Sequence, residues 1–101
     1  MEPAISESCR QYSDNIDAML NAPYFLANGM HAVSVSSAEV VTEMDCSPEM
    51  MNSNGFVHGG VIYGGMDHTH AILANIKGPA VGQSGNVEYF RPARGGAMRF
   101  V

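Results

Sequence analysis

The sequence predicts an α+β domain in which an antiparallel sheet wraps around one long central helix. Three observations support this fold class. Residues 38–46 alternate polar and apolar side chains, residues 61–76 carry apolar side chains at helical spacing, and strand-like stretches return at 80–90 and 97–101. Strands, then one long helix, then strands again are typical of an antiparallel sheet with a helix packed on one face.

The composition limits the classes of protein that this chain can belong to. It has 101 residues, of which 46% are hydrophobic and 15% are charged, so we expect one globular domain. The net charge of −5 leaves no basic patch for nucleic acid. No apolar run reaches the ~20 residues of a membrane span, and the N-terminus lacks a signal-peptide pattern. Cys9 and Cys46 show no metal-ligand spacing and imply no disulfide framework, so we expect a cytoplasmic protein.

The first part of the chain predicts a separate helical segment. Residues 1–8 are expected to form a frayed tail, and residues 9–28 one or two helical stretches. An apolar face recurs there at Tyr12, Ile16, Met19 and Leu20. We therefore divide the chain into an N-terminal helical segment at 1–28 and a main domain at 29–101.

A weak strand pattern begins the main domain at 30–35. We expect Val33 and Val35 to lie on one side of this strand and Ala32 and Ser34 on the other.

The pattern at 38–46 is clearer and predicts a half-buried strand with a solvated outer face. Its inward side chains are Ala38, Val40, Thr42, Met44 and Cys46. Its outward side chains are Glu39, Glu43 and Asp45, with Val41 among them.

Residues 61–76 form two stripes along the predicted central helix. The apolar stripe consists of Ile62, Met66, Thr69, Leu73 and Ile76. The second stripe consists of Gly60, Gly64, Asp67 and Ala71. Gly64 and Gly65 each cost a helix about 1 kcal/mol relative to alanine, so we expect that something packs very close to this face of the helix.

The start of this helix has the chemistry of an anion site. Gly59 and Gly60 would present unpaired N–H groups at the positive end of the helix dipole, which is able to hold a developing oxyanion. Asp67 follows about 12 Å further along the same helix. An ordinary core helix with a surface Asp is the alternative interpretation of this pattern.

Two separated motifs resemble one known family. The first consists of Asn52, Gly55, His58-Gly59-Gly60 and Asp67, and the second is the stretch Tyr89-Phe90-Arg91-Pro92-Ala93. Their content and order resemble the hotdog-fold acyl-CoA thioesterases, which include the phenylacetate-pathway thioesterase and thioesterase superfamily member 2. The resemblance covers roughly 29–101 and implies the hotdog fold. Members of that family continue with two more strands, so we expect a domain that is incomplete at its C-terminus, either as a truncated product or with the missing pairing supplied from elsewhere.

The resemblance also implies an activity, hydrolysis of an acyl- or aryl-CoA thioester to the free acid and coenzyme A. Gly59 would donate its N–H to the oxyanion, and Asp67 would act as nucleophile or general base. Because one thioester carbon cannot reach both groups on a single helix, the site would be shared between two subunits of a homodimer or of a dimer of dimers. Coenzyme A enters only as part of the substrate, and no other cofactor is implied.

Supporting roles follow for other residues of the two motifs. Asn52 would position water or the thioester, although an Asn before a glycine turn is commonly structural. His58 would orient the loop rather than transfer protons, and Gly60 would line the substrate site. A Ser or Thr near the start of the 80–90 strand assists in some family members. The matching position here is Gly82, and Ser84 is the nearby candidate.

Basic side chains near the second motif are candidates for binding coenzyme A. Arg91 and Arg94 flank the end of the predicted strand, where guanidinium groups could hold phosphates. Solvated surface charge is the alternative for both residues.

Two further functions compete with thioester hydrolysis, and a metal site is a third possibility. His68 and His70 point about 200° apart on a helix and lack acidic or Cys partners, so we expect no metal. Instead, His70 would lie one turn from Asp67 or pack against the sheet. A hotdog enoyl-CoA hydratase would carry His five residues after Asp67, where this chain has Ile72. A non-catalytic hotdog module that binds an acyl group or only dimerises is the main alternative.

Overall fold

The computed structural model of the chain describes residues 2–101. In chain order, its elements are β1 (Ala4–Ile5), the 3-10 helix η1 (Glu7–Tyr12), α1 (Ser13–Leu20), α2 (Pro23–Ala27), β2 (Met30–Val35), β3 (Val40–Asp45), the 3-10 helix η2 (Pro48–Met50), α3 (Gly59–Ala74) and β4 (Ala97–Phe100). The strands form one sheet in the order β1-β2-β3-β4. Strands β2, β3 and β4 pair antiparallel, whereas β1 joins β2 in parallel.

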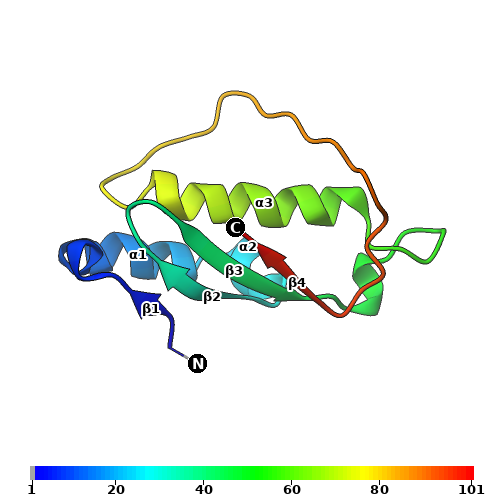
Figure 1. Cartoon of the computed structure of the whole chain (residues 1–101), viewed down its shortest axis with the longest axis horizontal. Coiled ribbons are helices and arrows are strands. Elements are labelled where there is room, and N and C mark those ends of the chain that lie inside the picture. Colours follow the sequence, from blue (N-terminus) through cyan, green and yellow to red (C-terminus); the bar gives the residue numbers. More distant parts are fainter. Residues whose placement is uncertain (1) are drawn as a thin grey trace.

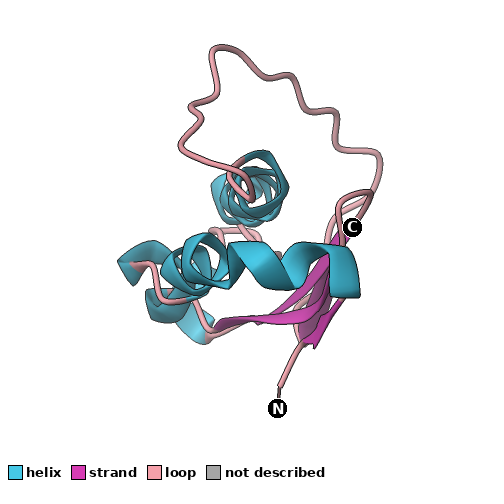
Figure 2. Cartoon of the chain, turned by 90° about the vertical axis from the view of Figure 1, so that its left-hand side faces the viewer, coloured by secondary structure: helices cyan, strands magenta, loops and turns pink. Residues whose placement is uncertain are grey.

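The long helix α3 lies along one face of this sheet, as predicted (Figure 1). It packs against β3 and β4, while α1 contacts α3 and α2 contacts β2. The segment that connects α3 to β4 arches over the side of α3 that faces away from the sheet (Figure 2). The fold class is therefore the predicted α+β arrangement of an antiparallel sheet around one central helix.

The core lies between α3, the sheet and the N-terminal helices. Its most deeply buried side chains include Phe25, Val35, Met44 and Ile72. One buried polar pair joins the two main layers, because the hydroxyls of Thr42 on β3 and Thr69 on α3 lie 2.7 Å apart. This pair aligns the helix along the sheet.

The predicted close packing on α3 is confirmed, and each glycine has its own partner. A Cβ added at Gly64 would overlap the hydroxyl of Tyr24, and one added at Gly65 would overlap the ring of Phe100. Only a residue without a side chain allows these two aromatic groups to approach the helix so closely. The intrinsic cost of both glycines to the helix is therefore offset by contacts with α2 and β4.

The predicted apolar stripe of α3 is partly wrong. The buried residues of the helix are Gly65, Thr69 and Ile72, whereas Met66 is 41% exposed. Compared with the predicted orientation, the helix is rotated about its axis. Gly65, rather than the neighbouring Met66, faces the ring of Phe100.

The side assignment in β2 is also wrong. Met30, Ala32 and Val35 are buried, and Val33 is only partly covered. The pairing with β3 shifts between Ala32 and Ser34, so an irregularity changes which side chains point inward. In β3 the prediction is confirmed for Val40, Thr42 and Met44, which are buried. It is wrong for Ala38, which is exposed ahead of the strand, and for Val41, which is buried rather than outward.

The predicted strand at 80–90 is absent from the structure. Among residues 2–101, no backbone–backbone hydrogen bond involves this stretch, and nearly all of it is exposed. A sequence with strand-like composition forms a strand only when a neighbouring strand satisfies its N–H and C=O groups. Here the segment runs as the arch over α3 instead (Figure 2). The predicted strand that follows it is confirmed as β4.

The expected frayed tail at 1–8 is wrong for the part that the structure describes. Ala4 and Ile5 pair with Ser34 and Val35 as β1, and the Ser6 N–H donates to the Val35 carbonyl at 2.9 Å. The extended start of the chain therefore adds a short strand to the sheet.

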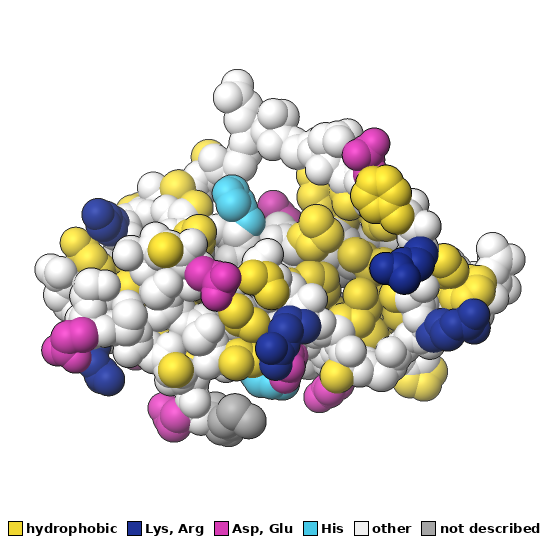
Figure 3. Space-filling model, in the orientation of Figure 1, with side chains coloured by type: hydrophobic (Ala, Val, Ile, Leu, Met, Phe, Trp, Pro, Cys, Tyr) yellow, Lys and Arg dark blue, Asp and Glu magenta, His cyan; other side chains and the backbone are white. Residues whose placement is uncertain are grey.

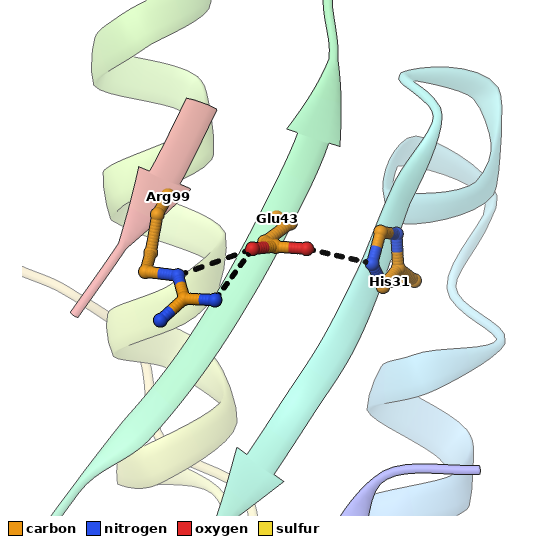
Figure 4. Close-up of polar contacts among 3 residues, drawn as sticks. All are labelled: His31, Glu43 and Arg99. Carbon is orange, nitrogen blue, oxygen red and sulfur yellow. Dashed lines mark hydrogen bonds and ion pairs between the residues drawn. The ribbon is translucent and has the colours of Figure 1, made fainter. Parts of the chain in front are cut away.

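Three charged or ionisable side chains lie side by side on neighbouring strands, on the outer face of the sheet. Glu43 on β3 sits opposite His31 on β2 and Arg99 on β4. Its carboxylate accepts two hydrogen bonds from the Arg99 guanidinium, at 2.7 and 3.1 Å, and lies 3.2 Å from His31 Nε2 (Figure 4). The hydrogen bond from Arg99 is the main reason that the pKa of Glu43 lies below its ordinary value. The three residues link the three antiparallel strands from outside.

Within residues 2–101, no helix is both long and apolar enough to cross a membrane. Cys9 and Cys46 are both free thiols.

Candidate active site

The start of α3 has the local geometry that the sequence predicts for an anion site. His58 is the N-cap residue, and its Nδ1 accepts the Gly60 N–H at 2.8 Å. The His58 carbonyl accepts the Val61 N–H at 2.9 Å and so begins the helical hydrogen bonds. The Gly59 N–H has no acceptor among residues 2–101. Of the first two N–H groups of this helix, one is therefore capped and the other is open.

His58 forms hydrogen bonds to the loop and to the helix start in this structure. Its N–H donates to the Met50 carbonyl at 2.8 Å, which ties the motif loop to η2. Because Nδ1 accepts a hydrogen bond from Gly60, the ring carries no proton on that nitrogen in this arrangement.

Asn52 builds the turn that precedes the helix. Its side-chain oxygen accepts the N–H groups of Asn54 at 2.9 Å and Phe56 at 3.1 Å. Gly55 occupies the left-handed conformation that this turn requires, with φ +82°. Asn52 therefore has the structural role that was the alternative interpretation, because its side chain holds the turn. The residue also lines a cavity beside the helix start.

A cavity of about 300 Å³ lies at the start of α3. Its lining includes Asn52, Phe56, Gly59, Tyr89 and Arg91. Hydrophobic side chains gather on this side of the molecule, where the arch descends to β4, and basic side chains lie beside them (Figure 3). The cavity thus combines an open N–H group, aromatic surface and one guanidinium group.

Arg94 lies next to this cavity, but its side chain has a different contact from that of Arg91. Its guanidinium carbon is 5.6 Å from the centroid of the Phe56 ring, a cation–π distance. Arg91 is exposed and lines the cavity itself. Of the two predicted phosphate ligands, the structure therefore brings only Arg91 into the lining with Gly59.

A second cavity, of about 590 Å³, lies under the arch around Asp67. It is lined by Asp67 and His70 from α3 and by Ser84 and Gly82 from the arch. The candidate Ser84 is thus brought to Asp67 by tertiary structure, because the arch folds back over the helix. His70 is exposed in this cavity rather than packed against the sheet.

Gly59 and Asp67 belong to different cavities on the same helix. The cavity at the helix start contains Gly59 and lacks Asp67, whereas the cavity under the arch contains Asp67 and lacks Gly59. A surface hollow of about 370 Å³, lined by both Gly60 and Asp67, lies along the helix between the two cavities. The separation expected from the eight-residue spacing is therefore retained in the folded chain.

Two residues of these cavities were missed by the sequence reasoning. Tyr63 lines the cavity around Asp67, and a Cβ at Gly85 would overlap its hydroxyl. Tyr89 donates its hydroxyl to the Gly59 carbonyl at 2.9 Å, across 30 positions of sequence. In the sequence, Tyr89 is only an aromatic residue of the second motif. Its hydroxyl group was the one feature that could have indicated a hydrogen bond.

The structure gives His68 a packing role. Its Nε2 lies 3.1 Å from the Met19 carbonyl, and its ring centroid is 4.9 Å from that of Phe25. Among residues 2–101, no group of three or more His, Cys, Asp or Glu side chains could hold a metal ion.

Comparison with known proteins gives a consistent family. Residues 54–100 match the model of the thioesterase superfamily. A Deinococcus radiodurans protein named "putative esterase" is 32% identical over 76 residues, which span 62% of this chain and 52% of that protein. The chain therefore spans about half the length of this curated relative.

Solved structures agree with that match. The PaaI protein from the phenylacetic acid degradation operon of E. coli superposes with a TM-score of 0.81 at 24% identity, covering 90% of this chain and 68% of that one. A mutant of the phenylacetic acid degradation protein PaaI from Thermus thermophilus gives a TM-score of 0.72 at 29% identity, covering 76% of this chain and 68% of that one. The fold is that of the hotdog proteins. Residues 54–100 of the chain resemble the thioesterase superfamily, and the fold as a whole resembles that of the PaaI proteins.

Proposed function

We propose that this chain hydrolyses an acyl- or aryl-CoA thioester, giving the free acid and coenzyme A. One observation carries the proposal. Helix α3 begins with a Gly59 N–H that has no acceptor among residues 2–101 and lines one cavity, it carries Asp67 in another cavity, and residues 54–100 match the thioesterase superfamily. An open N–H group suits the oxygen of a tetrahedral intermediate, and a carboxylate suits attack or water activation.

The reaction can be written for either role of Asp67. As general base, the carboxylate takes a proton from water while the water oxygen bonds to the thioester carbon. As nucleophile, it forms that bond itself, and water later cleaves the resulting anhydride. In both cases the carbonyl oxygen becomes negative beside the Gly59 N–H, the C–S bond breaks, and the thiolate leaves as coenzyme A.

The distance between the two groups supports a site shared by two copies of the chain. Eight helical residues separate Gly59 from Asp67, about 12 Å along the axis, so a single thioester carbon cannot contact both. We propose that Gly59 of one copy faces Asp67 of the other in a homodimer or a dimer of dimers. Ser84 would then assist at the Asp67 end, and Arg91 would bind coenzyme A phosphate near Gly59, with Arg94 close by.

The main alternative is a non-catalytic hotdog module that binds an acyl group or dimerises. Its support is the apolar surface beside Asp67, where Tyr63 is 36% exposed and Met66 is 41% exposed. Both functions predict acyl-CoA binding, and only the first predicts release of free thiol. Turnover therefore separates them.

The first experiment measures thiol release from a panel of acyl- and aryl-CoA thioesters. Asp67→Asn keeps the size of the side chain and removes its basicity, and Asp14→Asn on α1 is the matched control. We expect Asp67→Asn to lose turnover at an unchanged melting temperature, while Asp14→Asn retains it. Equal turnover in the wild type and Asp67→Asn would reject the role of Asp67, and binding without turnover in the wild type would favour the alternative.

A second experiment tests the shared site. Gly59→Pro removes the N–H at the first helical position, where proline is tolerated. Two inactive variants, Gly59→Pro and Asp67→Asn, are unfolded together and refolded as a mixture. A site shared between chains restores activity in mixed dimers, because one of their two sites has both groups intact. A mixture that stays inactive, despite demonstrated exchange of chains, would contradict sharing.

A further inference from the structure

The peptide unit between Gly59 and Gly60 is held on both of its polar sides by side chains. On one side the Gly60 N–H donates to His58 Nδ1 at 2.8 Å. On the other side the Gly59 carbonyl accepts the Tyr89 hydroxyl at 2.9 Å. A glycine peptide has little steric preference of its own, so these two hydrogen bonds restrict an otherwise permissive position.

The preceding peptide unit is held on its carbonyl side only. Its carbonyl, that of His58, accepts the N–H groups of Val61 at 2.9 Å and Ile62 at 3.3 Å. The Gly59 N–H belongs to this same unit and has no acceptor of its own among residues 2–101. With both flanking peptide planes held, the direction of the Gly59 N–H is set by the protein before any ligand arrives.

The ring of Tyr89 lies against Gly59 as well. A Cβ added at Gly59 would stand 3.3 Å from Tyr89 Cζ, which is closer than an ordinary van der Waals contact. The absence of a side chain at position 59 therefore lets the Tyr89 ring reach the helix start. Tyr89 comes from the arch, so its hydrogen bond also ties the arch to the first residue of α3.

From this geometry we infer that Tyr89 is a positioning residue for the Gly59 N–H. Together with His58 it clamps the Gly59–Gly60 peptide and aims the open N–H at the cavity of Asn52 and Arg91. The inference rests on the proposed function for its catalytic meaning, since an aimed N–H matters most where negative charge develops. The clamp itself is a property of the chain that is measurable without substrate.

The test uses Tyr89→Phe, which keeps the ring and removes only the hydroxyl. Tyr12→Phe is the control, because Tyr12 packs against the core and lies outside both cavities. We expect kcat of Tyr89→Phe to fall about three- to tenfold, the equivalent of one ordinary hydrogen bond. The KM should stay unchanged, because the oxyanion exists only in the transition state. If Tyr89→Phe lost activity only because the arch became looser, KM would rise or the melting temperature would fall instead.

NMR order parameters of the Gly59 and Gly60 amides provide the second readout. We expect both to fall in Tyr89→Phe and to stay at wild-type values in Tyr12→Phe. Unchanged order parameters, or an unchanged kcat in an active enzyme, would overturn the inference. A wild type that hydrolyses no thioester would reject the proposed function, and the order parameters would then still decide whether Tyr89 clamps the helix start.

Discussion

The hydroxyl oxygens of Thr42 and Thr69 lie 2.7 Å apart in the interior, between β3 and α3. Thr69 also donates to the Gly65 carbonyl at 2.7 Å, so the hydrogen between the two threonines comes from Thr42. Both side chains are buried. Their pairing requires one particular alignment of the helix on the sheet, the same alignment that places Gly65 against Phe100.

Replacing these threonines by valine should be strongly non-additive. Thr69→Val leaves the buried Thr42 hydroxyl without an acceptor and should destabilise the fold by about 1–3 kcal/mol. Thr42→Val leaves Thr69 its bond to Gly65, so the loss should be smaller, about 1 kcal/mol. The double variant should lose less than the sum, because no orphaned hydroxyl remains. Urea unfolding of the four proteins measures this, and additive losses would contradict the pairing.

Gly65→Ala should destabilise the protein even though alanine is the better helix former. The added methyl group meets the Phe100 ring, and overpacking of this kind costs about 1–3 kcal/mol. Gly82→Ala is the control, since nothing lies within 4 Å of its Cβ position. Thermal unfolding compares the two variants. A Gly65→Ala protein as stable as the wild type would show that the helix does not approach β4 so closely.

The contribution of Glu43 to stability should disappear in acid. Its hydrogen bond from Arg99 is the largest cause that holds the pKa of Glu43 below the ordinary value of 4.5. A carboxyl whose pKa is lower in the folded state stabilises the fold above its unfolded pKa, and this stabilisation is lost as the pH falls through the folded pKa. The difference in melting temperature between wild type and Glu43→Gln should therefore be constant near neutral pH and shrink below pH 4.5.

Glu49→Gln serves as the matched control for this pH series. Glu49 lies in η2 and forms no salt bridge within residues 2–101. The melting temperature of the Glu49→Gln variant should equal that of the wild type at every pH. Added salt should also reduce the Glu43 difference, because the Arg99 side chain of the pair is 60% exposed. A Glu43 difference that persists unchanged in acid would exclude the ion pair as its source.

Arg91 and Arg94 should differ in their effect on substrate binding. Arg91 lines the cavity with Gly59, whereas Arg94 stacks on Phe56. If Arg91 binds coenzyme A phosphate, Arg91→Ala should raise KM for a CoA thioester about tenfold or more. The same variant should leave KM unchanged for a truncated thioester without phosphates. Arg94→Ala should have the smaller effect on KM, and equal effects on both substrates would argue against phosphate recognition.

Local sequence patterns were sufficient to predict the presence of the central helix and of β3. A helical or alternating pattern survives folding when one face of the element is buried, as for Val40, Thr42 and Met44. The unusual pair Gly64 and Gly65 also indicated close packing, since glycine inside a helix is costly without such a contact.

Only tertiary structure decided which partner each of these groups meets. The pairing shift in β2 put Ala32 rather than Val33 on the buried side with Val35, because register depends on the neighbouring strand. The stretch 80–90 has strand-like residues but no strand beside it, so it arches over α3 and brings Ser84 to Asp67 and Tyr89 to Gly59. The sequence alone determined which residue types occupy the helix start and its face. Contacts between residues far apart in the chain determined their geometry, because such contacts exist only once the whole domain has packed.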